Sequence, residues 1–274
     1  MKKYIYCYFL TVLSLTCYAQ QSDSTAKLKQ PFFKRITFDA SNTGLTIIKT
    51  YARPFHWKKQ DWMKFGGVLV ISAGASFLDD PMYKYFRDHP TGPMDEFASV
   101  GDFLGQPEHN YPFMLAVWGS GVIINNDWLR DTGVMLFASV TTSGLIQTGL
   151  KELTGRARPS TGEGPHSFDP FSGPSYHSFP SGHTMLALAS AWILAHQVNF
   201  MPLKIAFYAL PIVTGISRVY VGAHWFSDIL LGSALGIACA ETVLRLYPKI
   251  KRNKNAALSF GPTSSGLGLV YKFK

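Results

Sequence analysis

Long apolar segments separated by short polar stretches dominate the second half of the chain. Each segment is too long for a buried strand and lacks alternation between apolar and polar positions, so the pattern predicts helices. Small and hydroxyl residues recur within them, as in membrane helices that pack closely together. The five predicted helices cover residues 112–124, 132–150, 183–200, 205–216 and 229–244.

The first half of the chain gives weaker signals. Residues 65–78 are apolar, but they fall short of the roughly 17–25 residues that span a bilayer. We expect a half-inserted or protein-covered helix there that does not cross. Residues 80–111 form a polar connection with an amphipathic pattern, and residues 57–62 combine tryptophan with lysine as segments at a membrane interface do.

The two ends of the chain carry separate signals. Residues 1–19 resemble an export signal, because Lys2 and Lys3 precede an apolar stretch and a small-residue cleavage site. An uncleaved membrane anchor and lipidation at Cys17 are the alternatives. Residues 257–273 alternate around glycine-containing turns, which predicts a short hairpin.

The expected fold class is therefore all-α, a multi-helix membrane bundle with an N-terminal signal peptide and a short hairpin-like C-terminal tail. The predicted organisation is a signal peptide at 1–19, a polar interfacial segment at 20–64, a helical domain at 65–247 and a basic tail at 248–274.

The basic tail also sets an expected orientation. Positive charge flanking membrane helices stays in the cytoplasm, so residues 248–254 should lie inside. Counting back through five spans places residues 151–180 and 218–224 outside, together with residue 111 and everything before it. That arrangement agrees with a cleaved signal only if residues 65–78 do not cross.

Composition narrows the function classes. The chain has 274 residues, of which 16% are charged, against about a quarter in a typical soluble domain. The net charge of +9 suits a membrane surface or an anionic substrate. No basic stripe with interleaved aromatic residues is present, so no nucleic-acid partner is expected. The three cysteines show neither zinc-site nor disulfide spacing.

The first candidate chemistry lies between two apolar runs, at residues 217–228. His224 and Asp228 are four residues apart, which places them on one face if the segment is helical. A carboxylate that orients an imidazole makes the imidazole a nucleophile. Arg218 offers a planar fork for an anion. The alternative is a buried His–Asp pair beside an interfacial arginine.

Two cations follow the second predicted helix. Lys151 and Arg158 are seven residues apart, about two turns if the helix continues, so both could face one multiply charged oxyanion. The alternative is a set of interfacial anchors at a helix end. Arg156 is either a third cation of this site or one such anchor.

Residues 180–183, Pro-Ser-Gly-His, directly precede an apolar helix. Ser181 suits a helix N-cap, and Gly182 allows close backbone approach. The free amides of a helix start bind phosphate, and His183 could donate a proton to a leaving oxygen there. The alternative is an ordinary capped helix with an incidental histidine.

The three segments together resemble the type 2 phosphatidic acid phosphatase superfamily, a relative of the vanadium haloperoxidases. They carry its pattern of Lys-x6-Arg-Pro, Pro-Ser-Gly-His and Ser-Arg-x5-His-x3-Asp in order. The resemblance implies a phosphohistidine on His224, with Asp228 orienting it and His183 as acid and base. It implies phosphate binding by Lys151, Arg158, Ser181, Gly182 and Arg218, with no cofactor.

The expected function is a metal-independent phosphatase of the bacterial cell envelope, integral to the inner membrane with its site facing the periplasm. Its substrate would be a lipid phosphate or diphosphate such as phosphatidylglycerol phosphate, phosphatidate, undecaprenyl diphosphate or lipid A. A secreted soluble acid phosphatase, a vanadium haloperoxidase and a non-catalytic lipid-phosphate binder are the alternatives. The sequence does not indicate an oligomeric state.

Overall fold

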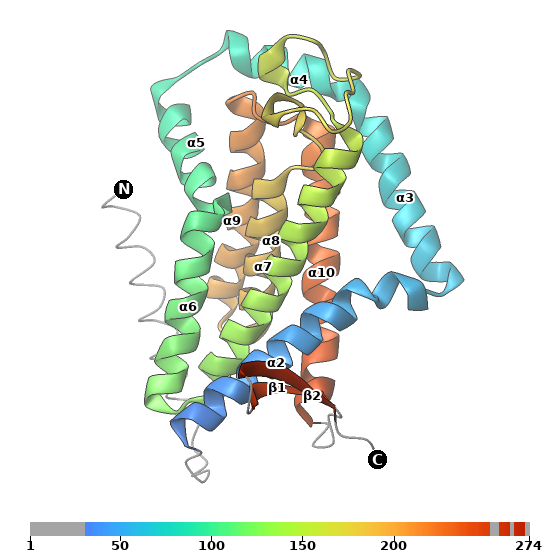
Figure 1. Cartoon of the computed structure of the whole chain (residues 1–274). Coiled ribbons are helices and arrows are strands. Elements are labelled where there is room, and N and C mark those ends of the chain that lie inside the picture. Colours follow the sequence, from blue (N-terminus) through green and yellow to red (C-terminus); the bar gives the residue numbers. More distant parts are fainter. Residues whose placement is uncertain (1–30, 253–257, 264–265, 272–274) are drawn as a thin grey trace.

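Four long helices form the centre of the molecule. The computed structural model describes residues 31–252, 258–263 and 266–271. Within them, helix α8 packs against α7, α9 and α10, and a core of buried apolar side chains fills the space between these helices. Figure 1 shows the four helices running side by side along the long axis. Their bounds are α7 Asp127–Thr154, α8 Gly182–Gln197, α9 Met201–Tyr220 and α10 Phe226–Arg252.

The five predicted apolar helices are confirmed. They correspond to α6 (Pro107–Ile124) and to α7, α8, α9 and α10. Of the helices in the described part of the chain, α7 and α10 are long and apolar enough by themselves to cross a bilayer.

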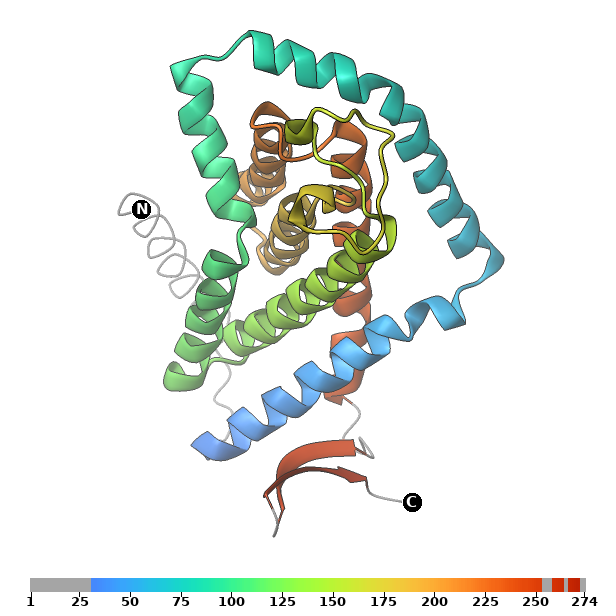
Figure 2. The same cartoon turned by 45° about the horizontal axis from the view of Figure 1, so that its top comes forward.

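Residues 59–105 form an arm of helices, which includes most of the polar connection expected at residues 80–111. It consists of α3 (Lys59–Ala75), the short turn Ser76–Leu78, α4 (Asp79–Asp88) and α5 (Gly92–Gly105). Figure 2 shows α2 through α6 framing the central four helices. The expected protein cover over residues 65–78 is wrong. Ser72 is the one buried residue of α3, while Val70 and Ile71 are exposed, because the helix touches its neighbour α10 along one narrow side.

Helix α2 (Phe32–Tyr51) was not predicted. Its buried and exposed faces are the reverse of those of a helix in a water-soluble protein. The side chains it buries are polar, and its exposed side chains include Phe33, Phe38 and Ile48. A helix in water buries its apolar stripe instead. The buried residues are Asp39, Asn42, Thr46 and Thr50.

The position of α2 corrects the expected orientation. Arg35 donates to the carbonyl of Val122 at the end of α6, and Asp39 pairs with Arg130 near the start of α7. In Figure 1 α2 lies at the end of the bundle opposite the loop that joins α7 to α8. Residues before 111 therefore do not all lie on the side of that loop. The chain passes from one end to the other along α3, because α3 is 17 residues long rather than the short apolar run alone.

The tail contributes two strands, β1 (Leu258–Thr263) and β2 (Gly266–Tyr271), which pair antiparallel with Leu258 opposite Tyr271. They lie beside α2 in Figures 1 and 2. The predicted signal peptide, residues 1–19, lies outside the described residues.

Candidate active site

Three segments meet at one end of the central bundle. They are the end of α7 with the loop after it, the start of α8, and the connection between α9 and α10. Hydrogen bonds to backbone carbonyls join them: the Arg158 side chain donates from Nη1 to the carbonyl of Ala223 at 3.0 Å, and the Ser181 amide donates to the carbonyl of Asp228 at 3.0 Å. The structure thus brings the predicted site residues together.

His224 is held in one orientation by the loop before α8. Its side chain is buried, and Nδ1 lies 2.6 Å from the carbonyl oxygen of Ser178. A carbonyl oxygen only accepts, so Nδ1 carries the proton and Nε2 keeps its lone pair. Burial, followed by the positive charges of Lys151 and Arg158, holds the pKa of His224 well below its usual value. The imidazole is therefore a neutral nucleophile at neutral pH.

Asp228 does not contact His224 in the way the spacing predicts. Helix α10 begins at Phe226, so His224 precedes it and the two residues do not share a helix face. His224 Nδ1 and Asp228 Oδ2 are 3.9 Å apart, which is too long for a hydrogen bond. Asp228 Oδ2 instead accepts from Ser178 Oγ at 2.6 Å. Ser178, which no sequence pattern marked, therefore bridges the carboxylate and the imidazole.

Arg156 is neither a third phosphate cation nor an interfacial anchor. Its guanidinium is 3% exposed and pairs with two buried carboxylates. Nη1 donates to Asp228 Oδ1 and to Ser227 Oγ, and Nη2 donates to Asp79 Oδ2 at 2.7 Å. Arg156 thus fixes the carboxylate that supports Ser178.

Lys151 and Arg158 face the same site but not from one helix. Helix α7 ends at Thr154, and Gly155 adopts φ +54°, so the predicted two-turn spacing does not apply. Arg158 donates to the carbonyls of Pro174 and Ala223 rather than to a carboxylate. No described carboxylate pairs with Lys151 Nζ. Two positive charges therefore stand beside His224, and neither is directly paired with a described carboxylate.

The start of α8 differs in detail from the expected cap. Ser181 occupies the N-cap position, but its hydroxyl bonds Thr184 Oγ1 at 3.0 Å and no backbone amide. A Cβ at position 182 would lie 1.9 Å from Gln147 Oε1, so any other residue there would force the Gln147 side chain to move. His183 follows in the first turn of the helix, on the same side as Lys151 and Arg158, whose charges it feels.

Arg218 is oriented by a carboxylate that sequence reasoning missed. Its Nη1 pairs with Asp102 of α5, and Nη2 donates to the carbonyl of Ala98. The same Asp102 Oδ1 lies 3.3 Å from His183 Nε2. Asp102 thus joins the expected acid–base histidine to an expected phosphate ligand. It sits in a segment with no recognisable motif.

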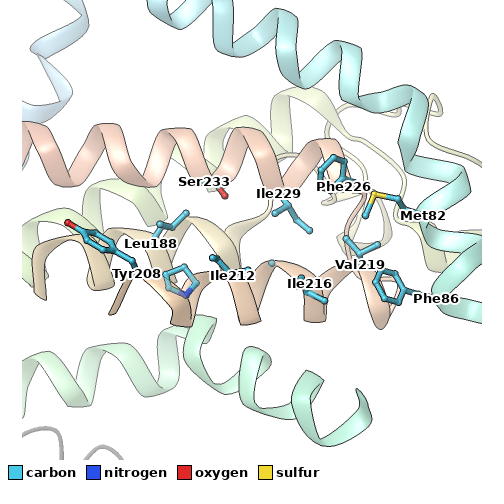
Figure 3. A pocket seen from close by; sticks show the side chains of 12 residues that line it. Met82, Phe86, Leu188, Tyr208, Ile212, Ile216, Val219, Phe226, Ile229 and Ser233 are labelled. Carbon is cyan, nitrogen blue, oxygen red and sulfur yellow. The ribbon is translucent and has the colours of Figure 1, made fainter. Parts of the chain in front are cut away.

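An apolar groove runs between α9 and α10 (Figure 3), with Leu188 of α8 as its floor and Met82 and Phe86 of α4 at one end. Its volume is about 240 Å³, and none of the candidate site residues lines it. Within the described residues, no cluster of three or more His, Cys, Asp or Glu side chains could hold a metal ion.

The arrangement suits phosphoryl transfer to a histidine. A buried neutral imidazole, protonated on Nδ1, lies beside two cations that make no direct ion pair, and such cations stabilise the charge that develops on a transferring phosphoryl group. A second histidine lies beside them at a helix start, where an anion is favoured.

Comparison with known proteins agrees with this geometry. The model of the PAP2 superfamily matches residues 132–252. A lipid A 1-phosphatase of Rhizobium etli is 43% identical over 107 residues, which cover 38% of this chain and 45% of that protein. The match therefore spans less than half of that relative's length.

Two further similarities cover more of the fold. Phosphatidylglycerophosphatase B of Bacillus subtilis is 29% identical over 54% of this chain and 73% of its own length. The crystal structure of a transmembrane PAP2-type phosphatidylglycerolphosphate phosphatase from Bacillus subtilis superposes with a TM-score of 0.55 at 25% identity, over 69% of this chain and 96% of that one. The likeness to PAP2 proteins thus extends beyond residues 132–252 to most of the helical part of this chain.

Proposed function

We propose that the protein is a metal-independent phosphatase that removes phosphate from a lipid phosphate or diphosphate through a phosphohistidine. The observation that carries this proposal is the environment of His224, whose proton is fixed on Nδ1 and whose imidazole lies close enough to Lys151 and Arg158 for their charges to lower its pKa. The relatives named above, which act on lipid A and on phosphatidylglycerol phosphate, support a lipid substrate.

The reaction proceeds in two balanced steps. His224 Nε2 attacks phosphorus, the bond to the leaving oxygen breaks, and His183 gives that oxygen a proton. Water then attacks the phosphohistidine while His183 takes a proton from it, which releases phosphate and restores His224. Lys151, Arg158 and Arg218, with the amides at the start of α8, hold the phosphoryl oxygens.

A panel of lipids tests this function. The purified protein in detergent is given phosphatidylglycerol phosphate, phosphatidate, undecaprenyl diphosphate and lipid A in turn, each with and without EDTA, and released phosphate is measured. We expect release from at least one lipid by the wild type and none by His224→Ala. Equal release by both proteins, or loss of release with EDTA, contradicts the proposal.

The membrane placement is also part of the proposal: the inner membrane, with the site facing the periplasm. Exposed apolar side chains on α2 and α3 suit contact with lipid, and α2 carries its polar side chains inward. The end opposite the site is rich in cations, which favours the cytoplasm there. Those cations are Lys34, Lys49, Arg53, Lys58, Lys59, Lys249, Lys251 and Arg252.

This orientation is incompatible with an export signal at residues 1–19 that carries the following residues across the membrane. With the site outside, α2 lies inside, so residues 1–19 would not carry residue 32 across. Single cysteines at Lys249 and Ser160, in a background without the native cysteines, decide between them through an impermeant maleimide applied to spheroplasts, because Lys249 lies at the same end of the bundle as α2. Labelling of Ser160→Cys alone supports the proposed orientation; labelling of Lys249→Cys alone reverses it and favours the export signal.

A further inference from the structure

One residue of the buried network at the site lies far outside the segment that matches the family model. Asp79, the first residue of α4, is fully buried. Its Oδ1 accepts from the Ser227 amide at 2.8 Å, and its Oδ2 accepts from Ser227 Oγ at 2.6 Å and from Arg156 Nη2 at 2.7 Å. Both carboxylate oxygens are therefore committed to residues next to the site.

The contacts of Asp79 continue to the nucleophile in an unbroken series. Arg156 connects Asp79 to Asp228, and Asp228 accepts from the Ser178 hydroxyl. The carbonyl of Ser178 accepts from His224 Nδ1 at 2.6 Å. These contacts thus link the Asp79 carboxylate to the His224 imidazole through Arg156, Asp228 and Ser178.

Asp79 also fixes the point at which the arm meets the central bundle. Ser72 Oγ of α3 donates to the carbonyl of Ser227 at 2.9 Å, one residue before Asp228. Arg156 is held from its other side by the carbonyl of Pro165 at 2.9 and 2.7 Å. With Asp79 in place, the guanidinium has no freedom to turn away from Asp228.

We propose that Asp79 is a positioning residue for the reaction at His224, acting through Arg156, Asp228 and Ser178. This inference rests on the proposed function. A buried charge pair that serves only the fold would leave the folded enzyme's turnover unchanged when weakened, whereas a positioning pair would not. A displacement of about 1 Å at a reacting group can lower turnover on the order of 100-fold.

The chain offers a matched control in the next residue. Asp80 is about half exposed and pairs with Lys84 on the surface. Asp79→Asn and Asp80→Asn make the same chemical change one residue apart. We expect Asp79→Asn to lower kcat by at least about tenfold with little change in KM, and Asp80→Asn to leave both unchanged. A kcat within twofold of the wild type for folded Asp79→Asn overturns the inference.

A second measurement does not need the lipid. Orthovanadate imitates the transferring phosphoryl group and binds through the histidine nitrogen, so its Kd, measured by equilibrium dialysis, reports the orientation of His224. We expect the Kd to rise at least about tenfold in Asp79→Asn, to stay constant in Asp80→Asn, and to become unmeasurable in His224→Ala. An unchanged Kd in Asp79→Asn, or no binding by the wild type, overturns the inference.

The outcomes separate the two proposals. Wild-type vanadate binding that weakens in Asp79→Asn, with no phosphate released from any lipid, defeats the proposed function and supports the positioning role. Phosphate release that is identical in Asp79→Asn and Asp80→Asn supports the proposed function and defeats the positioning role. If Asp79→Asn does not fold, Ser227→Ala removes one contact to Asp79 and one to Arg156; unchanged kcat in that variant overturns the inference.

Discussion

Two buried arginines mark the two ends of α7. Arg130, in the first turn of the helix, pairs with Asp39 through Nη2 and Nε at 2.7 and 2.9 Å. Arg156, just past the last turn, pairs with Asp79 and Asp228. Each arginine is nearly inaccessible, and each joins α7 to a helix from the first part of the chain.

The two pairs differ in what surrounds them. Asp39 is shared with Trp118, and Arg130 is shared with Asp127, so that network ends in groups that do not react. The Arg156 network continues through Ser178 to His224. A buried ion pair is therefore not evidence of function by itself. The same kind of pair fixes a helix at one end of α7 and orients a nucleophile at the other end.

The largest expected effect isolates the chemistry at the Arg156 end. We expect His224→Gln to lower phosphate release by more than about 10³-fold, because the amide has no nucleophilic nitrogen. Circular dichroism and thermal unfolding should match the wild type. Release within tenfold of the wild type would show that the reacting nitrogen lies elsewhere.

The next effect compares the arginines directly. Breaking a buried pair leaves an uncompensated charge, so Arg156→Ala and Arg130→Ala should each lower the free energy of unfolding by about 3–5 kcal/mol. Denaturant titration in mixed micelles measures this loss. Only Arg156→Ala should also lower kcat per folded molecule. An equal fall of kcat in Arg130→Ala would mean that the two ends are coupled through α7.

Sequence reasoning succeeded where local pattern carries the information. The apolar runs located α6 to α10, and the three motifs marked residues that the fold brings to one end of the bundle, namely Lys151, Arg158, His183, Arg218 and His224. It failed for α2, because a helix that buries Asp39 and Asn42 and exposes Phe33 has no apolar run to detect.

The supporting residues of the site carry no local signal. Asp79 meets Ser227 from 148 positions away, and Asp102 meets Arg218 from 116. Only the folded chain brings such residues together. The direct His224–Asp228 contact failed for a different reason, because α10 begins after His224 and the four-residue spacing is not helical there.

A smaller effect concerns pH at the Arg156 end. Burial and two neighbouring cations lower the pKa of His224. The imidazole therefore stays neutral at pH values below the ordinary pKa of histidine, and kcat/KM should hold as the pH falls past about 6.5. Replacing Lys151 with Met removes one cation, so the pKa of His224 should rise and the acidic limb should move to higher pH. Lys204→Met, at the opposite end of the bundle, is the control. If the acidic limb does not move in Lys151→Met, the result argues against the proximity of Lys151 and His224.

The smallest effect calibrates the comparison. Lys84 and Asp80 are 2.6 Å apart but about half exposed, beside the fully buried Asp79. Exposed pairs contribute about 0–1 kcal/mol, because water solvates both charges when they separate. Lys84→Ala should therefore lower the free energy of unfolding by less than about 1 kcal/mol, with kcat unchanged, in the same titration used for the arginine variants. A loss as large as that of Arg130→Ala would mean that burial does not distinguish these pairs, and the contrast between the two ends of α7 would then have to rest on catalysis alone.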